Sequence, residues 1–252
     1  MGASTGCTDW HHSRTAPWVF ATGLVLRAFA LCVLPQAPSL SAHAAHATQV
    51  ASRPPPVSGE GTGSSALRAD FGTLRPPETV RQLADSVVRS RDHEGLPFAL
   101  VEKQGARLYM FNSEGVLTGS SAVLLGAAKG DVSVPGIGER PLKLIKPSER
   151  TTPAGRFVIE RGRNAAGEDI VWIDYDDAVS LHRVRTTNPA ERRLQRLRSP
   201  TARDNRISYG CINVPVAFFD QYIAPVFTGR RGVVYVLPEV LPLTAVFPGL
   251  VF

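Results

Sequence analysis

RISYGCINVP, residues 206–215, contains Cys211, one of the three cysteines of this 252-residue chain. The other two, Cys7 and Cys32, lie within the first 32 residues. Gly210 directly precedes Cys211 and predicts a tight turn, because glycine adopts backbone conformations that other residues avoid. The sequence therefore predicts one cysteine in a constrained turn in the C-terminal part of the chain. The role of that cysteine is the first question that the sequence raises.

The first 47 residues have the order of a secretory signal peptide. Arg14 precedes an apolar stretch, residues 16–35, and small-residue cleavage patterns follow at positions 42–47. Arg27 interrupts the apolar stretch, and this favours cleavage over a permanent anchor, because a spanning helix needs about 20 apolar residues. We predict a protein exported to the periplasm or cell wall, with no stable membrane insertion.

Cleavage would remove Cys7 and Cys32, and the mature chain would keep a single cysteine. An oxidising compartment joins thiols in pairs. A lone cysteine there is buried and inert, linked to another chain, or reactive for a purpose.

The remainder of the chain divides into four segments. Residues 48–76 are rich in Pro, Ser and Gly and predict a disordered linker. Residues 77–95 predict one helix, because apolar residues recur along a single helical face. The positions on that face are Val80, Leu83, Ala84, Val87 and Val88. Residues 96–238 are predicted to form the main domain. The apolar tail, residues 239–252, is predicted either to pack against that domain or to mediate association with another chain.

The sequence of the main domain predicts many short strands, separated by turns rich in Gly, Pro, Asn and Asp. The strongest candidates are residues 98–103 and 106–111, which read as a hairpin, and then residues 116–126, 155–160, 170–175, 178–184 and 232–238. This pattern predicts a mainly β fold with short helices, arranged as a compact mixed sheet or sandwich. The 43% hydrophobic and 20% charged composition is that of a globular protein.

An arginine-rich connection, residues 183–207, interrupts the series of strands. Asn188, Pro189 and Glu191 predict the start of a short helix that ends near Ser199. Eight arginines in this connection face two acidic residues, a local charge of +6 that equals the net charge of the whole chain. Two interpretations have equal weight: a solvated helix face, and an entrance that binds carboxylates through guanidinium groups. Nucleic-acid binding is disfavoured, because no aromatic residue interleaves the arginines.

A cysteine becomes a strong nucleophile as the thiolate, so Cys211 needs a base. Four of the six histidines lie in or next to the predicted signal, and this leaves His93 and His182. His93 stands among charged residues and is expected at the surface. His182 ends an apolar strand, where a rigid support can hold a catalytic side chain.

These residues resemble the L,D-transpeptidases of bacterial cell-wall synthesis. That family carries a histidine, a spacer, and then Ser/Thr-His-Gly-Cys-hydrophobic-Asn or Arg. His182 and SYGCIN, residues 208–213, match this order, and TPAGRF, residues 152–157, matches a second block, Thr-Pro-x-Gly-x-Phe. The hairpin at residues 98–111 is also similar to the first strands of that domain. The resemblance covers about residues 96–237 and implies the L,D-transpeptidase catalytic fold.

The resemblance implies roles for individual residues. Cys211 would be the nucleophile and His182 the general base and acid, with the carbonyl of Arg183 orienting the imidazole. Backbone amides from Tyr209 through Gly210 to Cys211 would form an oxyanion hole. The remaining assignments are supporting roles for Ser208 and Asn213 and substrate binding by Tyr175, Arg203 and Arg206.

The implied reaction cleaves the bond between the diamino acid and D-alanine in a peptidoglycan tetrapeptide stem and passes the acyl group to an amine. No cofactor or metal is implied, and β-lactams of the carbapenem class are expected inhibitors. Water or a protein lysine could replace the amine, giving an L,D-carboxypeptidase or a protein-anchoring enzyme. A catalytically degenerate wall-binding module is a further alternative.

Two departures from the family pattern affect these expectations. Tyr209 stands where the family has its second histidine, and 29 positions separate His182 from Cys211, a longer spacer than usual.

Overall fold

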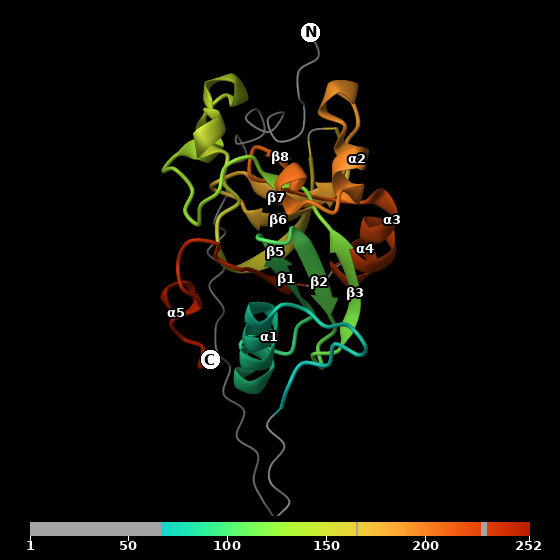
Figure 1. Ribbon diagram of the computed structural model, residues 1–252, viewed down its shortest axis with the longest axis vertical. Coiled ribbons are helices and arrows are strands. Elements are labelled where there is room, and N and C mark those ends of the chain that lie inside the picture. The colour runs from blue at the N-terminus through green and yellow to red at the C-terminus, as the bar shows by residue number, and fades with distance from the viewer. Residues whose placement is uncertain (1–66, 165, 228–230) are drawn as a thin grey trace, which may run out of the picture. The chain divides into compact units, whose positions relative to one another are not determined.

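The computed structural model describes residues 67–164, 166–227 and 231–252 (Figure 1). The predicted signal peptide and most of the predicted linker lie outside these residues. Within the described part of the chain, no helix is long and apolar enough to cross a membrane.

Strands dominate the described chain. They are β1 (Phe98–Glu102), β2 (Arg107–Phe111), β3 (Leu117–Ala122), β4 (Leu125–Gly126), β5 (Gly155–Arg163), β6 (Asp169–Asp174), β7 (Val179–Arg183), β8 (Arg206–Ser208), β9 (Ile212–Val214) and β10 (Gly232–Val236). The α-helices are α1 (Glu78–Ser90), α2 (Arg193–Arg198), α3 (Val216–Phe218), α4 (Ala224–Phe227) and α5 (Leu243–Val246), and a π-helical turn (Phe219–Ile223) joins α3 to α4. The prediction of a mainly β fold with short helices is confirmed.

Eight strands form one mixed sheet in the order β3-β2-β1-β10-β5-β6-β7-β9, and β4 and β8 form a second, two-stranded sheet. The predicted hairpin is present, with Phe98 of β1 paired to Phe111 of β2. Leu124, just after β3, exchanges backbone hydrogen bonds of 2.8 and 2.9 Å with Asn213 of β9. Because β3 and β9 are the two edges of the large sheet, this bridge nearly closes the sheet on itself.

Closure gives the central strands two buried faces. In β1, Ala99 and Val101 face the inside of the curved sheet, while Phe98 and Leu100 face outward, where α1 packs. Alternation along a strand sends successive side chains to opposite faces. The residues that fill the inside include Leu108, Met110, Leu181, Ile212, Val214, Phe219, Ile223 and Phe227. The strand that carries His182 therefore rests on a closed apolar core.

Helix α1 and the C-terminal tail cover the outer face of β1, β2 and β10. All five predicted apolar positions of α1 are buried. Phe247 and Leu250 of the tail join the same cluster, so of the two expectations for the tail, packing against the domain is what the structure has. The ordered chain begins before residue 77, because Asp70 pairs with Val116 and the Phe71 ring lies edge-on to Phe111.

His93 follows α1 and is buried, so the expectation of a surface position is wrong. Its Nε2 lies 3.0 Å from the Ser113 carbonyl, and its ring lies 5.2 Å from that of Phe98. Left-handed residues at Arg91 and Glu94 turn the chain back at the helix end and fold the histidine inward.

The arginine-rich connection forms two short helical pieces in place of one helix. Asn188 caps the first piece, a 3₁₀ turn (Pro189–Glu191), by accepting a hydrogen bond from the amide of Ala190. Arg192 then takes a left-handed conformation with φ of 47°, and α2 begins at Arg193 and ends at Arg198. The predicted end near Ser199 is confirmed.

A buried ion cluster fastens the loop before β5 to the tail. Lys103 Nζ lies 2.7 Å from Asp131 Oδ1 and 3.8 Å from Glu239 Oε1, and all three side chains are at most 3% exposed. Asp131 also accepts hydrogen bonds from the amides of residues 239–241. Burial alone would raise the pKa of Asp131, but these donors hold it at about 2.

Candidate active site

Parallel pairing of β7 with β9 sets the geometry of the candidate site. His182 lies opposite Asn213 in this ladder, and Cys211 directly precedes β9. Ser180 and Cys211 lie two positions earlier on the same face, with 3.6 Å between the Ser180 hydroxyl and the Cys211 sulfur. Because strands lie about 4.8 Å apart and rise about 3.3 Å per residue, side chains offset by two positions remain within reach of each other. The fold thus places His182 and Cys211 on the same face of adjacent segments, offset by two positions, and proton transfer between them stays a prediction.

Cys211 is 3% exposed, and its sulfur also lies 3.7 Å from the Ala178 carbonyl. The structure records Cys211 in a disulfide bond. A disulfide sulfur is not a nucleophile, and chemistry at Cys211 therefore requires the reduced form.

His182 is held in one tautomer. Its Nδ1 lies 2.7 Å from the Arg183 carbonyl, the contact that the family resemblance implied. Because a carbonyl only accepts, Nδ1 carries the proton, and Nε2 keeps a lone pair. Asn213 Nδ2 lies 3.2 Å from that Nε2. Burial lowers the pKa of His182 to about 4, against an opposing effect of the Arg183 carbonyl. Neutral imidazole with a basic Nε2 is the form suited to accept a proton.

The turn before Cys211 is fixed by hydrogen bonds from both sequence blocks. Thr152, from the TPAGRF block, donates to the Gly210 carbonyl at 2.8 Å. Ser208 donates to the Cys211 carbonyl at 2.6 Å and accepts from the Gly210 amide at 3.2 Å. In this state the Gly210 amide is bonded within the loop, so the amides of Tyr209 and Cys211 are left as candidates for an oxyanion hole.

Gly210→Ala is expected to disable this turn. Gly210 has φ of +136°, and an added Cβ would lie 2.8 Å from the Thr151 carbonyl oxygen. We expect acylation of Cys211 to slow about 10²-fold, the effect of losing one oxyanion donor, as followed by intact-protein mass spectrometry. Gly136→Ala is the matched control, because Gly136 also has a positive φ of +71° but faces open space. Equal acylation rates in both variants would contradict this account of Gly210.

The other predicted site residues are placed as follows. The Tyr209 ring lies under the guanidinium of Arg150, 3.9 Å from centroid to Cζ. Arg206 is bound to Glu239 and to the Lys103 carbonyl. Tyr175 is 47% exposed and lies edge-on to Trp172, and Arg203 is exposed on a 3₁₀ turn. The substrate-binding roles of Tyr175, Arg203 and Arg206 stay predictions.

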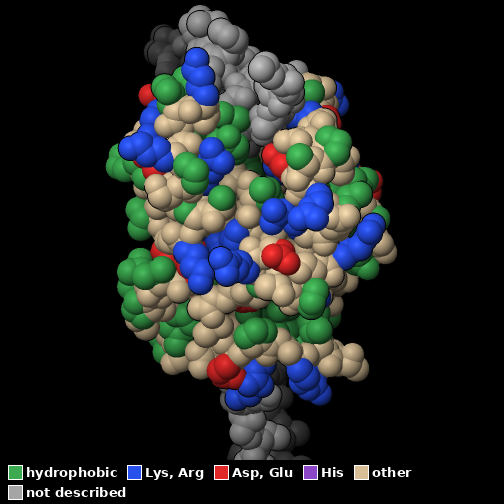
Figure 2. Space-filling model, turned by 45° about the horizontal axis from the view of Figure 1, so that its top comes forward, with side chains coloured by type: hydrophobic (Ala, Val, Ile, Leu, Met, Phe, Trp, Pro, Cys, Tyr) green, Lys and Arg blue, Asp and Glu red, His purple; other side chains and the backbone are tan. Residues whose placement is uncertain are grey.

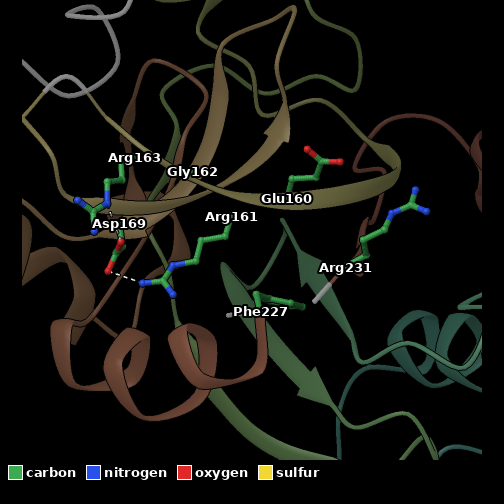
Figure 3. Close-up of a pocket in the computed structure, with 7 residues that line it drawn as sticks. All are labelled: Glu160, Arg161, Gly162, Arg163, Asp169, Phe227 and Arg231. Carbon is green, nitrogen blue, oxygen red and sulfur yellow. Dashed lines mark ion pairs between the residues drawn. The ribbon is translucent and has the colours of Figure 1, made fainter. Parts of the chain in front are cut away.

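Two cavities bear on the location of the site. A pocket of about 270 Å³ is lined by His182 together with Glu168, Asp169, Arg183, Arg185 and Val216, among others. A larger pocket of about 500 Å³ lies beside β5 and α4, where Arg161 and Arg163 face Asp169 (Figure 3). We place the site next to the smaller pocket, because His182 lines it, whereas His182 is absent from the lining of the larger one. No cluster of potential metal ligands occurs among the residues that the structure describes.

Three residues of the site were not identified from the sequence. Ser180 contacts the sulfur, Thr152 fastens the turn, and Arg193 Nη1 donates to Asn213 Oδ1. The TPAGRF block is a sequence signal for Thr152, since it matches the Thr-Pro-x-Gly-x-Phe block of the family. Ser180 could have been found from strand alternation, as the position two residues before His182. Nothing in the sequence points Arg193 toward Asn213.

Comparison with known proteins gives similarity in structure but not in sequence. No protein-family model matches the chain, and no curated protein matches it. The structure is similar to the catalytic domain of the Enterococcus faecium L,D-transpeptidase, at 16% identity and a TM-score of 0.33, over 56% of this chain and 96% of that one. It is similar to a Xylanimonas cellulosilytica L,D-transpeptidase at 12% identity and 0.36, over 56% and 60% of the two chains. The Campylobacter jejuni helical cell shape determining protein Pgp2 matches at 12% identity and 0.38, over 58% of this chain and 48% of its own.

Proposed function

We propose that this protein is an exported peptidoglycan L,D-transpeptidase with the Cys211 thiolate as nucleophile and His182 as its base. The convergence of the two sequence blocks carries the proposal. TPAGRF and SYGCIN lie far apart in the chain, yet Thr152 of the first holds the Gly210 turn of the second. The same turn places Cys211 beside the strand of His182, whose Nε2 is the unprotonated ring nitrogen and takes the thiol proton once the Asn213 N–H moves off its lone pair.

The first half-reaction forms a thioester. The Cys211 proton moves to His182 Nε2 while the sulfur attacks the carbonyl carbon between the diamino acid and D-alanine. Amides of the Tyr209–Cys211 turn stabilise the negative oxygen. The C–N bond then breaks, the imidazolium gives its proton to the departing amine, and D-alanine leaves.

The second half-reaction transfers the acyl group. The side-chain amine of a neighbouring stem attacks the thioester carbon and loses a proton to His182, and the C–S bond breaks. The thiol is restored, and the two stems are joined by a new amide bond.

The test of this proposal uses the reduced protein. With disaccharide-tetrapeptide, we expect release of D-alanine and formation of cross-linked dimer, and with a carbapenem we expect one adduct on Cys211. Ertapenem acylates the similar Enterococcus faecium domain and is a suitable probe. Cys211→Ala should abolish turnover and adduct. Turnover that persists in Cys211→Ala, or a wild type that forms neither product nor adduct, would refute the proposal.

The acceptor decides between three outcomes of the same thioester. Water would give an L,D-carboxypeptidase, a protein lysine would give an anchoring enzyme, and a second stem gives the transpeptidase. Product analysis of the same reaction separates them.

A wall-binding module without turnover is the second candidate function. On the face in Figure 2, Lys and Arg side chains outnumber Asp and Glu, as binding to an anionic wall polymer would require. Wall binding that survives Cys211→Ala, in a protein whose wild type shows no turnover, would favour this candidate.

A further inference from the structure

We propose that Arg193, from the arginine-rich connection, is a positioning residue that fixes the orientation of the Asn213 amide and thereby keeps His182 a neutral base. The inference rests on the proposed function for its catalytic meaning. The effect of the Arg193 guanidinium on the His182 imidazole, transmitted through the Asn213 amide, can be measured without any substrate.

A chain of contacts joins Arg193 to His182. Arg193 Nη1 donates to Asn213 Oδ1, and Asn213 Nδ2 lies 3.2 Å from His182 Nε2. Asn213 is 0% exposed, and the Arg193 side chain is only 10% exposed. Arg193 Nε also donates to Glu191, which holds the guanidinium from its other side. The side chains of Arg193, Asn213 and His182 therefore have few alternative orientations.

The chemistry of the donors fixes the direction of every hydrogen bond. A guanidinium has only donors, so the oxygen end of the Asn213 amide must face Arg193. The nitrogen end then faces His182 and offers an N–H to Nε2, which must be the unprotonated ring atom. The Arg183 carbonyl independently requires the proton on Nδ1. Two unrelated contacts thus select the same tautomer.

The positive charges of Arg193 and Arg185 also favour the neutral imidazole, and Glu168 and the Arg183 carbonyl oppose them. The groups that bear on the imidazole are Arg193 from α2, Arg185 and Glu168 from the pocket wall, and the Arg183 carbonyl. Asp169 lines the same pocket, and Cys211 lies on the neighbouring segment. After burial, the positive charge of Arg193 is the largest of the effects that hold the pKa of His182 near 4.

This arrangement suits the second role of the histidine. An imidazolium that forms opposite the Asn213 N–H has no acceptor there and has a cation close by, so it is a strong acid. It returns its proton readily to the amine that leaves, which is the acid half of acid–base catalysis.

The experiment is an NMR titration of the His182 ring nitrogens in the reduced protein. In Arg193→Met the amide can rotate and present Oδ1 to Nε2, and the cation is gone. We expect the pKa of His182 to rise from about 4 toward its ordinary 6.5, by about one unit or more, the size of a close-charge effect. Arg193→Lys, which still donates, should shift it less. The acid limb of the acylation rate should move to higher pH in parallel.

Arg198→Met is the matched control, because Arg198 lies on the same helix and is exposed. It removes the same charge and should leave the titration unchanged. Asn213→Asp tests the relay without altering Arg193: an acceptor then faces Nε2, and the pKa of His182 should rise.

An unchanged pKa in Arg193→Met, or an equal rise in Arg198→Met, would overturn the inference. If the titration shifts as expected but the wild type forms no acyl adduct, the proposed function fails while the role of Arg193 stands.

Discussion

His182→Gln is expected to acylate Cys211 about 10²- to 10⁴-fold more slowly than the wild type, the range of a lost general base. Without the imidazole, attack depends on the small fraction of thiolate that exists in solution. The rate of the variant should therefore rise with pH up to the pKa of an ordinary thiol, about 8.5. The wild type should keep its rate down to about pH 4, because its imidazole is neutral above that pKa. Stopped-flow acylation of the reduced protein by a carbapenem measures both profiles.

His93→Gln is the control for this prediction, as His93 is the other histidine among the described residues. It contacts the carbonyls of Val87 and Ser113, outside the site. We expect it to lower stability and to leave the acylation rate of the folded protein unchanged. Wild-type acylation by His182→Gln would remove the histidine from the mechanism.

Lys103→Met should produce the largest loss of stability, about 3 kcal/mol in the free energy of unfolding. Removing one partner of a buried ion pair costs about 3–5 kcal/mol, because the remaining charge is left uncompensated. The lower end applies here, since Asp131 keeps its backbone donors and Glu239 keeps Arg206. Urea unfolding measures the difference. Lys103 also donates to the Thr152 carbonyl at 3.0 Å, so acylation should slow as well.

The pH dependence of this loss follows from Asp131. Its pKa is about 2 in the folded protein and 3.8 ordinarily, so the pair stabilises fully above 3.8 and loses its effect as pH falls through about 2. The gap between wild type and Lys103→Met should narrow over that interval. Lys143→Met, at an exposed lysine, is the control, and an equal loss there would contradict a specific role for the cluster.

Local patterns in the sequence predicted most of the strands and the first helix, because their side chains alternate or recur regularly. The helical period predicts five buried apolar positions on α1, and all five are buried. The segment at residues 216–227 escaped prediction, since its aromatic residues, Pro225 and a π-helical turn follow neither period. His93 was misplaced because its charged neighbours mask a left-handed turn that buries it.

Prediction of the site depended on the kind of signal that each residue carries. Cys211 and His182 stood out by residue type and motif, and the pairing of β7 with β9 places them on the same face, offset by two positions. Arg193 carries no such signal. Eight arginines in one connection look alike in sequence, and only the three-dimensional path of α2 distinguishes the one that reaches Asn213.

The Leu124–Asn213 bridge ties assembly to activity. Its two halves come from opposite margins of the sheet and from distant parts of the chain, so the entropy lost in joining them makes it a late event in folding. The residue that completes the barrel-like wall is also the one whose side chain braces the imidazole. A partly folded molecule that lacks this bridge would thus contain the Cys211 thiol without a correctly oriented His182. Cys211 would become reactive only when the Leu124–Asn213 bridge forms.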